Sequence, residues 1–158
     1  MLVPKDFEVP VLLETDRYRI RPISVHDVVR DYDAVMTSVE RLRGIFGPES
    51  SWPPPDLSFT QDLVDLGWHH KEFQRRSSFA YVVMNLEETS QLGCVYVYPS
   101  SRSGWDAEVH LWVRDLPDAD ELDADLYRTV TGWVTEAWPF EKVAFPGRSI
   151  DWAEWMNR

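Results

Sequence analysis

Residues 105–138 constrain the fold of this 158-residue chain more than any other stretch. Polar and apolar side chains alternate over residues 105–114, as they do in a β-strand, and residues 122–138 carry an apolar stripe at helical spacing. A strand that leads into an amphipathic helix is typical of α/β proteins, in which the intervening turn often holds an anion on free backbone N–H groups. The sequence therefore predicts an α/β structure with a cofactor site near this junction.

The residues of the turn oppose an ordinary anion site. Residues 115–121 contain no glycine, and the turn and first helical turns are rich in acids: Asp118, Asp120, Glu121, Asp123 and Asp125. Their carboxylates are expected to occupy the N–H groups and to repel a phosphate, and Asp118 with Glu121 has the spacing of a capping box. At about 4 Å and an effective dielectric constant of about 20, one like-charge contact costs about 4 kcal/mol.

Composition favours a globular protein of one domain over residues 1–158. With 16 basic and 27 acidic residues the net charge is −11, which repels nucleic acids and anionic membranes and favours cationic small molecules. The single cysteine, Cys94, excludes an internal disulfide. We find neither the pattern of a signal peptide nor that of a membrane span, so we expect a cytoplasmic protein without nucleic-acid or membrane partners.

Periodicity and turn residues predict the remaining elements. In chain order these are an irregular lead-in over 1–16, a strand at 17–21, a helix from the Ser24–Asp27 capping box to Leu42, a helix at 59–73, strands at 79–84 and 92–98, the 105–114 strand, the 122–138 helix, a short strand at 141–145 and a final helix capped by Ser149. The order is βααβββαβα. The 59–73 helix is predicted to bury a stripe made of Phe59, Leu63, Leu66, His70 and Phe73.

Three segments in this order resemble the GNAT superfamily of acetyl-CoA-dependent N-acetyltransferases: residues 14–22, the 79–83 and 92–96 pair, and residues 105–114. The resemblance spans residues 14–146 and implies a mixed, mostly antiparallel sheet flanked by helices. It also implies acetyl-CoA as cofactor and a small-molecule or peptide amine as acceptor. The family's Arg-x-x-Gly-x-Gly/Ala loop has no counterpart after Arg114, and the family usually continues further, so the fold is expected to be truncated after its fifth strand.

Alternation in the 105–114 strand places Glu108, His110, Trp112 and Arg114 on one face. By the resemblance, Glu108 takes the position of the general base, in an apolar cleft that raises its pKa. His110 is an alternative base, and a structural pairing of Glu108 with His110 or an arginine is the competing interpretation. The backbone of Trp112, Val113 and Arg114 matches the segment that holds the cofactor's pantetheine arm in the family.

Other polar and aromatic residues are interpreted as structural. His69 and His70 with Glu72 lack the spacing of a helical zinc site and are read as a solvated helix face, so no metal is predicted. Three tyrosines on the predicted hairpin are compatible with a pocket lining, but core aromatics with solvated hydroxyls are the favoured interpretation: Tyr81, Tyr96 and Tyr98.

Two functions remain open. The first is an N-acetyltransferase that uses acetyl-CoA and a primary amine. The second is a non-catalytic GNAT-like binding or assembly module, for example a homodimer that buries Trp152 and Trp155 and covers the edge of the short last strand.

Overall fold

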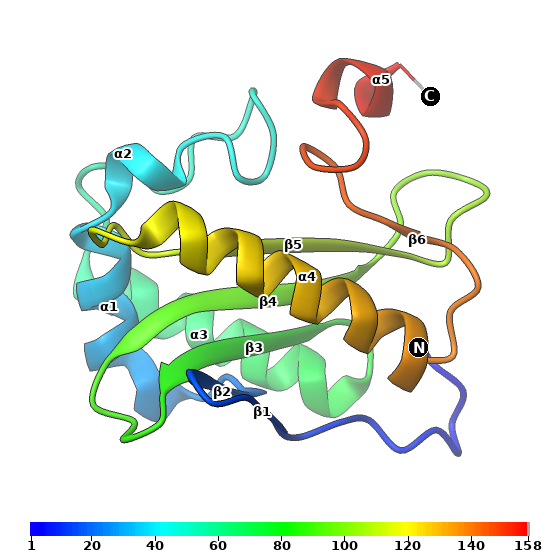
Figure 1. The fold of residues 1–158 in the computed structure, drawn as a ribbon, viewed down its shortest axis with the longest axis horizontal. Helices are drawn as coiled ribbons and strands as arrows, with labels where there is room; N and C mark the ends of the chain where they lie inside the picture. Colours follow the sequence, from blue (N-terminus) through cyan, green and yellow to red (C-terminus); the bar gives the residue numbers. More distant parts are fainter. Residues whose placement is uncertain (158) are drawn as a thin grey trace.

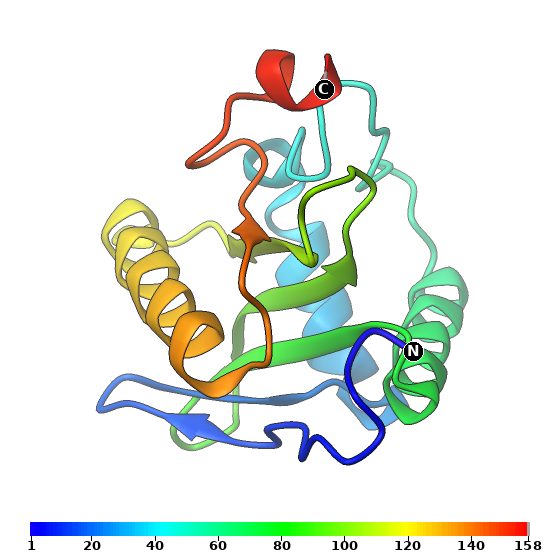
Figure 2. The same cartoon turned by 90° about the vertical axis from the view of Figure 1, so that its right-hand side faces the viewer.

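The computed structural model describes residues 1–157, which form a six-stranded sheet with helices on both faces (Figures 1 and 2). The strands are Leu13–Glu14 (β1), Tyr18–Pro22 (β2), Phe79–Asn85 (β3), Gln91–Pro99 (β4), Ala107–Val113 (β5) and Val143–Ala144 (β6). The helices are Val25–Asp27 (η1, a 3-10 helix), Val28–Met36 (α1), Val39–Leu42 (α2), Phe59–Arg75 (α3), Ala119–Ala137 (α4) and Trp152–Met156 (α5). Neighbours in the sheet follow the chain order, and all pair antiparallel except β5 and β6. The predicted α/β class and mostly antiparallel sheet are confirmed.

The sheet separates two apolar cores, because successive side chains of a strand point to opposite faces. One core joins the odd-numbered residues of β5 to the stripe of α4: Ala107, Val109, Leu111 and Val113 with Leu122, Leu126, Val130 and Val134. The other core places Trp112 of β5 with side chains from β3, β4, α1 and α3. The predicted division of this strand into two faces is therefore confirmed.

The long helix predicted after the capping box is divided in the structure. The Ser24–Asp27 capping box is present, but the helix ends at Met36 and restarts at Val39. The Thr37 hydroxyl donates to the Asp33 carbonyl at 2.7 Å, and the Ser38 hydroxyl accepts from the Asp115 N–H at 2.8 Å. Hydroxyls that bond locally compete with helix propagation, and here the break lets Ser38 bind the turn after β5.

The face predicted for the second helix is wrong in its first half, at Phe59 and Leu63, whereas Leu66 and Phe73 pack inward as predicted. In α3 the side chains of Asp62 and Leu66 are buried, whereas Leu63 is 38% exposed. Adjacent helical positions differ by 100°, so choosing the apolar Leu63 over Asp62 rotated the predicted stripe. An acid consequently faces the sheet.

Other element ends also differ from the prediction, and the last strand covers only 143–144 of the predicted 141–145. Strand β1 lies within the predicted irregular lead-in, α4 begins at Ala119, three residues early, and α5 has Asp151 rather than Ser149 at its N-cap. These shifts leave the order of the major elements intact.

The chain leaves the sheet after β6 through a turn that requires glycine. Gly147 has φ +77°, and a Cβ at this position would collide with Nε1 of Trp152 and lie 2.8 Å from its Cε2 atom. The same indole packs against Gly47, 3.6 Å from the site of its absent Cβ. The C-terminal segment and the loop after α2 therefore meet at one end of the sheet (Figure 1).

Replacing Gly147 with alanine should destabilise the protein more than replacing Gly44 with alanine. Gly44 has φ +80° and open space around it, so both variants incur the cost of about 1–2 kcal/mol for a left-handed residue. Only Gly147→Ala also displaces Trp152, which should add about 1–3 kcal/mol. Urea unfolding measures the difference, and equal losses would contradict the contact.

Candidate functional site

The two edges of β5 are paired unequally. Its β4 edge is paired along the whole strand, from Ala107 to Val113, whereas β6 pairs only with Ala107 and Glu108. The Arg114 N–H donates to the Leu92 carbonyl of β4, so by alternation Leu111 and Val113 direct their backbone groups to the opposite edge. Beyond Glu108, no strand among residues 1–157 pairs with that edge.

Glu108 and His110 form a pair beside this open edge, on the face opposite α4. His110 Nε2 lies 3.2 Å from Glu108 Oε1, and the His110 side chain is 5% exposed. The imidazole is stacked on Trp152, with 6.0 Å between ring centroids and planes 9° apart. Both residues line a cavity of about 460 Å³ together with Tyr98 and Trp155. The structure thus brings together the two residues predicted to act as bases.

The expectation that the cleft raises the pKa of Glu108 is wrong. Burial does raise it, but hydrogen bonds from His110 and from the Ser101 N–H and hydroxyl outweigh burial, and the net pKa is lowered. The Ser101 contacts to Glu108 Oε2 are 2.9 and 2.8 Å long. Glu108 is therefore an ionised hydrogen-bond acceptor that orients His110.

The three residues predicted to hold a cofactor arm are placed differently from one another. The Trp112 side chain is buried and donates to the Tyr96 hydroxyl at 2.9 Å. The Arg114 side chain reaches Asp33 at 3.0 Å, and its N–H is used by β4. Of the three, Val113 alone directs its backbone to the open edge.

Arg148 occupies part of the open edge. Its Nη2 donates to the Leu111 carbonyl at 3.1 Å, and its guanidinium pairs with both carboxylate oxygens of Asp123 at 2.8 and 2.9 Å. Such a two-point pair is among the stronger polar contacts in proteins. A side chain from beyond β6 is thereby clamped between β5 and α4.

The acids at the start of α4 do not crowd its N–H groups as predicted. Asp118 makes no side-chain cap, so the predicted capping box with Glu121 is absent. Instead Asp118 pairs with Arg17 at 3.1 Å, and Asp120 pairs with Arg41 at 2.8 Å. Each arginine offsets one carboxylate, which reduces the repulsion that the sequence suggested.

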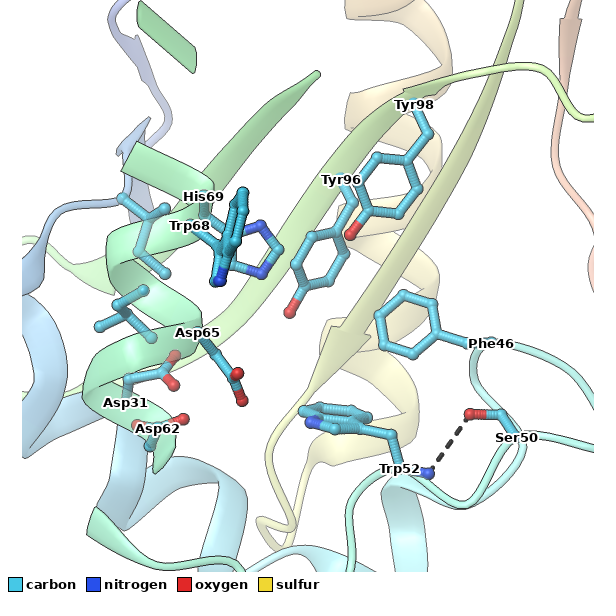
Figure 3. Close-up of a pocket in the computed structure, with 12 residues that line it drawn as sticks. Asp31, Phe46, Ser50, Trp52, Asp62, Asp65, Trp68, His69, Tyr96 and Tyr98 are labelled. Atoms are coloured by element: carbon cyan, nitrogen blue, oxygen red, sulfur yellow. Dashed lines mark hydrogen bonds between the residues drawn. The ribbon is translucent and has the colours of Figure 1, made fainter. Parts of the chain in front are cut away.

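A second cavity, of about 540 Å³, lies between α3, β4 and the loop after α2 (Figure 3). Its walls are largely aromatic and its α3 side is acidic: Phe46, Trp52, Trp68, His69, Tyr96 and Tyr98 surround Asp31, Asp62 and Asp65. The Asp65 carboxylate and the Tyr96 hydroxyl point toward the same space in Figure 3. Tyr96 and Tyr98 belong to the core, as predicted, and also line this cavity, whereas His69 is half-buried in the lining rather than on a solvated helix face.

Asp31 and Asp62 are buried together and share a proton. Both residues are less than 5% exposed. Burial raises the pKa of Asp62 to about 8, with the neighbouring Asp31 adding to the shift, and burial also raises the pKa of Asp31. Asp62 is the protonated partner that donates to Asp31, whose carboxylate also accepts from Gln91.

Sequence reasoning missed this acidic group. Asp31 interrupts the apolar stripe of α1, since Val28 and Val35 lie three residues before and four residues after it. Asp62 and His69 are seven residues apart with Leu66 between them, which is also a helical stripe. Polar residues at buried stripe positions were the available signal.

The chain has the fold of GNAT acetyltransferases. Solved structures that it matches include a ribosomal-protein-S5-alanine acetyltransferase from Vibrio fischeri (TM-score 0.62, 16% identity, 81% of this chain and 69% of that chain). Another is RimL, a ribosomal L7/L12 alpha-N-protein acetyltransferase in complex with coenzyme A (TM-score 0.59, 12% identity, 78% and 67%). A third is an acetyltransferase from Agrobacterium tumefaciens (TM-score 0.52, 18% identity, 82% and 69%). No family model matches the sequence, and no curated protein matches it.

None of the helices within residues 1–157 has the length and apolar character needed to cross a membrane. Within the same range, no three or more histidine, cysteine, aspartate or glutamate side chains are grouped so as to hold a metal ion.

Replacing Asp62 with asparagine should stabilise the protein increasingly as pH rises from 5 to 8. The folded carboxyl has a pKa of about 8 against a usual 3.8, so in this window the unfolded chain is deprotonated and the folded chain is not. The wild type therefore loses stability with rising pH, whereas asparagine does not titrate. The gain at pH 8 relative to pH 5 should be on the order of 3 kcal/mol by chemical denaturation. Asp56→Asn, at an exposed position, is the control, and parallel curves for wild type and Asp62→Asn would contradict the shared proton.

Proposed function

We propose that this protein is a GNAT-type N-acetyltransferase that transfers an acetyl group from acetyl-CoA to a primary amine. The observation that carries the proposal is the unpaired edge of β5 beside the buried His110–Glu108 pair. This edge offers the Val113 backbone groups to an extended ligand, whereas the Leu111 carbonyl accepts from Arg148, and the imidazole lies on the same strand. The similarity to solved N-acetyltransferases supports the reaction class by analogy of fold.

The residues present fit the extended arm of acetyl-CoA better than they fit its pyrophosphate. The backbone of Val113 can bond an amide-containing arm as a neighbouring strand would. At the start of α4, Ala119 N–H bonds Leu116 and Leu122 N–H bonds Asp118. Because the carboxylates of Asp118 and Asp120 are already paired, the dipole of α4 remains able to attract a phosphate. No glycine loop, however, brings the backbone close to that phosphate.

His110 is the proton acceptor in this proposal. A carboxylate only accepts hydrogen bonds, so Nε2 carries the hydrogen that is donated to Glu108, and Nδ1 holds the free lone pair. Nδ1 is buried and has no hydrogen-bond partner among the described residues. The cofactor supplies an acetyl thioester. His110 Nδ1 removes a proton from the acceptor ammonium, and Glu108 positions the ring and stabilises the imidazolium that results.

Acetyl-CoA should raise the melting temperature of the wild type, and more so that of Arg148→Ala. Arg148 occupies the Leu111 carbonyl, so its removal frees one backbone acceptor at the edge. A ligand at ten times its Kd stabilises the folded state by about 1.4 kcal/mol, which for this length corresponds to about 3–6 °C. Arg128→Ala is the control, because Arg128 is exposed and pairs within α4. The absence of a shift in both the wild type and Arg148→Ala at millimolar acetyl-CoA would overturn the proposal.

Loss of the imidazole should lower turnover by about 10²–10⁴-fold in His110→Ala, as expected for a general base. Glu108→Gln should lower turnover less, because it keeps the ring in place without a full charge. Thiol release from acetyl-CoA over a panel of primary amines measures both variants, with Glu141→Gln, at an exposed position, as the control. Unchanged turnover in His110→Ala would remove the assigned role.

A non-catalytic module is the second candidate function. The Arg148–Asp123 clamp favours this candidate, because it closes the open edge of β5 with one of the chain's own side chains. Trp155 is 4% exposed within the single chain. A homodimer would accordingly use the outer edge of β6 rather than this tryptophan. Sedimentation of the protein, together with the acetyl-CoA titration above, separates the two candidates.

A further inference from the structure

We propose that the cavity between α3, β4 and residues 46–52 binds an organic cation, that is, an ammonium or quaternary ammonium group carried on an apolar body. The proposal concerns binding alone, and it stands whether or not the chain transfers an acetyl group.

The cavity lining is acidic and has no compensating positive side chain. The cavity lining contains three aspartates and neither lysine nor arginine. Among residues 1–157, the arginines that form ion pairs do so with other acids, including Asp27, Asp33, Asp118, Asp120 and Asp123. Lys71 Nζ lies 4.4 Å from the ring centroid of Trp68, a lining residue that is 55% exposed. Asp31, Asp62 and Asp65 take part in none of these arginine pairs.

The Asp62 carboxyl is buried at the base of the cavity. Asp62 is 3% exposed, and its Oδ2 accepts a hydrogen bond from no donor of the described residues. Its one polar contact is with Asp31, another acid, which requires a proton between the two groups. A buried carboxyl pair that lines an open cavity is costly unless a positive group compensates it.

Aromatic rings form a wall of the cavity. The Phe46 ring contacts both Trp52 and Tyr96, with a centroid distance of 5.2 Å to each. Tyr96 is stacked with Tyr98 at 5.7 Å. Figure 3 shows these rings facing the Asp65 carboxylate across the cavity. Aromatic faces attract cations and bury apolar groups, whereas a small inorganic ion would gain little from them.

Several other groups face the Asp31–Asp62 pair and enter any pH dependence. These are Asp27 on η1, Asp65 and His69 on α3, and Cys94, Tyr96 and Tyr98 on β4. Burial lowers the pKa of His69 and raises the pKa values of Cys94, Tyr96 and Tyr98. These four groups are therefore neutral at pH 7, and Asp62 is the group whose charge changes near pH 8.

The test uses benzyltrimethylammonium, whose charge does not change with pH, and compares it with the neutral benzyl alcohol and the anionic phenylacetate. Quenching of tryptophan fluorescence and calorimetry on the full chain, without acetyl-CoA, measure binding. We expect saturable binding of the cation and at least tenfold weaker binding of the other two. Equal binding of cation and alcohol, or tighter binding of calcium ions than of the organic cation, would overturn the proposal.

Two variants locate the site. Asp65→Asn, at a half-buried position, should weaken binding about tenfold, and Asp56→Asn on the exposed loop before α3 should leave it unchanged. Asp62→Asn should bind within about twofold of wild type at pH 7, because Asp62 is already neutral there. From pH 7 to 9 the wild-type affinity should rise severalfold, while that of Asp62→Asn stays level. Equal effects of Asp65→Asn and Asp56→Asn, or the same pH slope in Asp62→Asn, would contradict the assignment.

Discussion

The unequal pairing of β5 determines the arrangement of the whole candidate site. A central strand with partners on both sides has no backbone groups to spare, and β5 has a second partner for only two of its residues. The turn at Pro146 and Gly147 causes this, because the Phe145 carbonyl bonds the N–H groups of Arg148 and Ile150 instead of a strand. The chain then folds back over His110 through Trp152. One short strand thus creates the open edge and also delivers the residues that partly cover it.

Charge is organised in two ways in the molecule. The acids around the start of α4 pair with arginines from distant segments: Arg17, Arg41 and Arg148. These arginines offset most of the negative charge that the sequence concentrates in this turn. Within residues 1–157, the acids of α1 and α3 that line the larger cavity have no such partners. Because exposed ion pairs contribute little to stability, the pairing around α4 matters chiefly for the local potential.

Local patterns made much of the fold and part of the site predictable. Alternation in β5 placed Glu108 and His110 on one face, and the Ser24–Asp27 spacing located a helix start. Long-range pairing was not predictable: nothing local indicates that Asp118 meets Arg17, 101 residues away, or that Arg148 reaches the Leu111 carbonyl. The acidic cavity was missed because apolar Leu63 outweighed adjacent Asp62 in the helical pattern. The pKa of Glu108 depends on Ser101, which only the folded loop brings into contact.

The two cavities are parts of one construction, because Phe46, Ser50 and Tyr98 line both of them. The His110 ring contacts Phe46 at 5.5 Å and Tyr98 at 5.9 Å, so its environment depends on the same rings that form the aromatic wall. A hydrogen-bonded series from Trp112 through Tyr96 and Cys94 to Asp31 joins β5 to α1 beneath that wall. The position of the loop after α2 therefore governs both sites. That position is set by Gly47, which has φ +116° and packs against Trp152, so the C-terminal segment holds the wall in place from the opposite side.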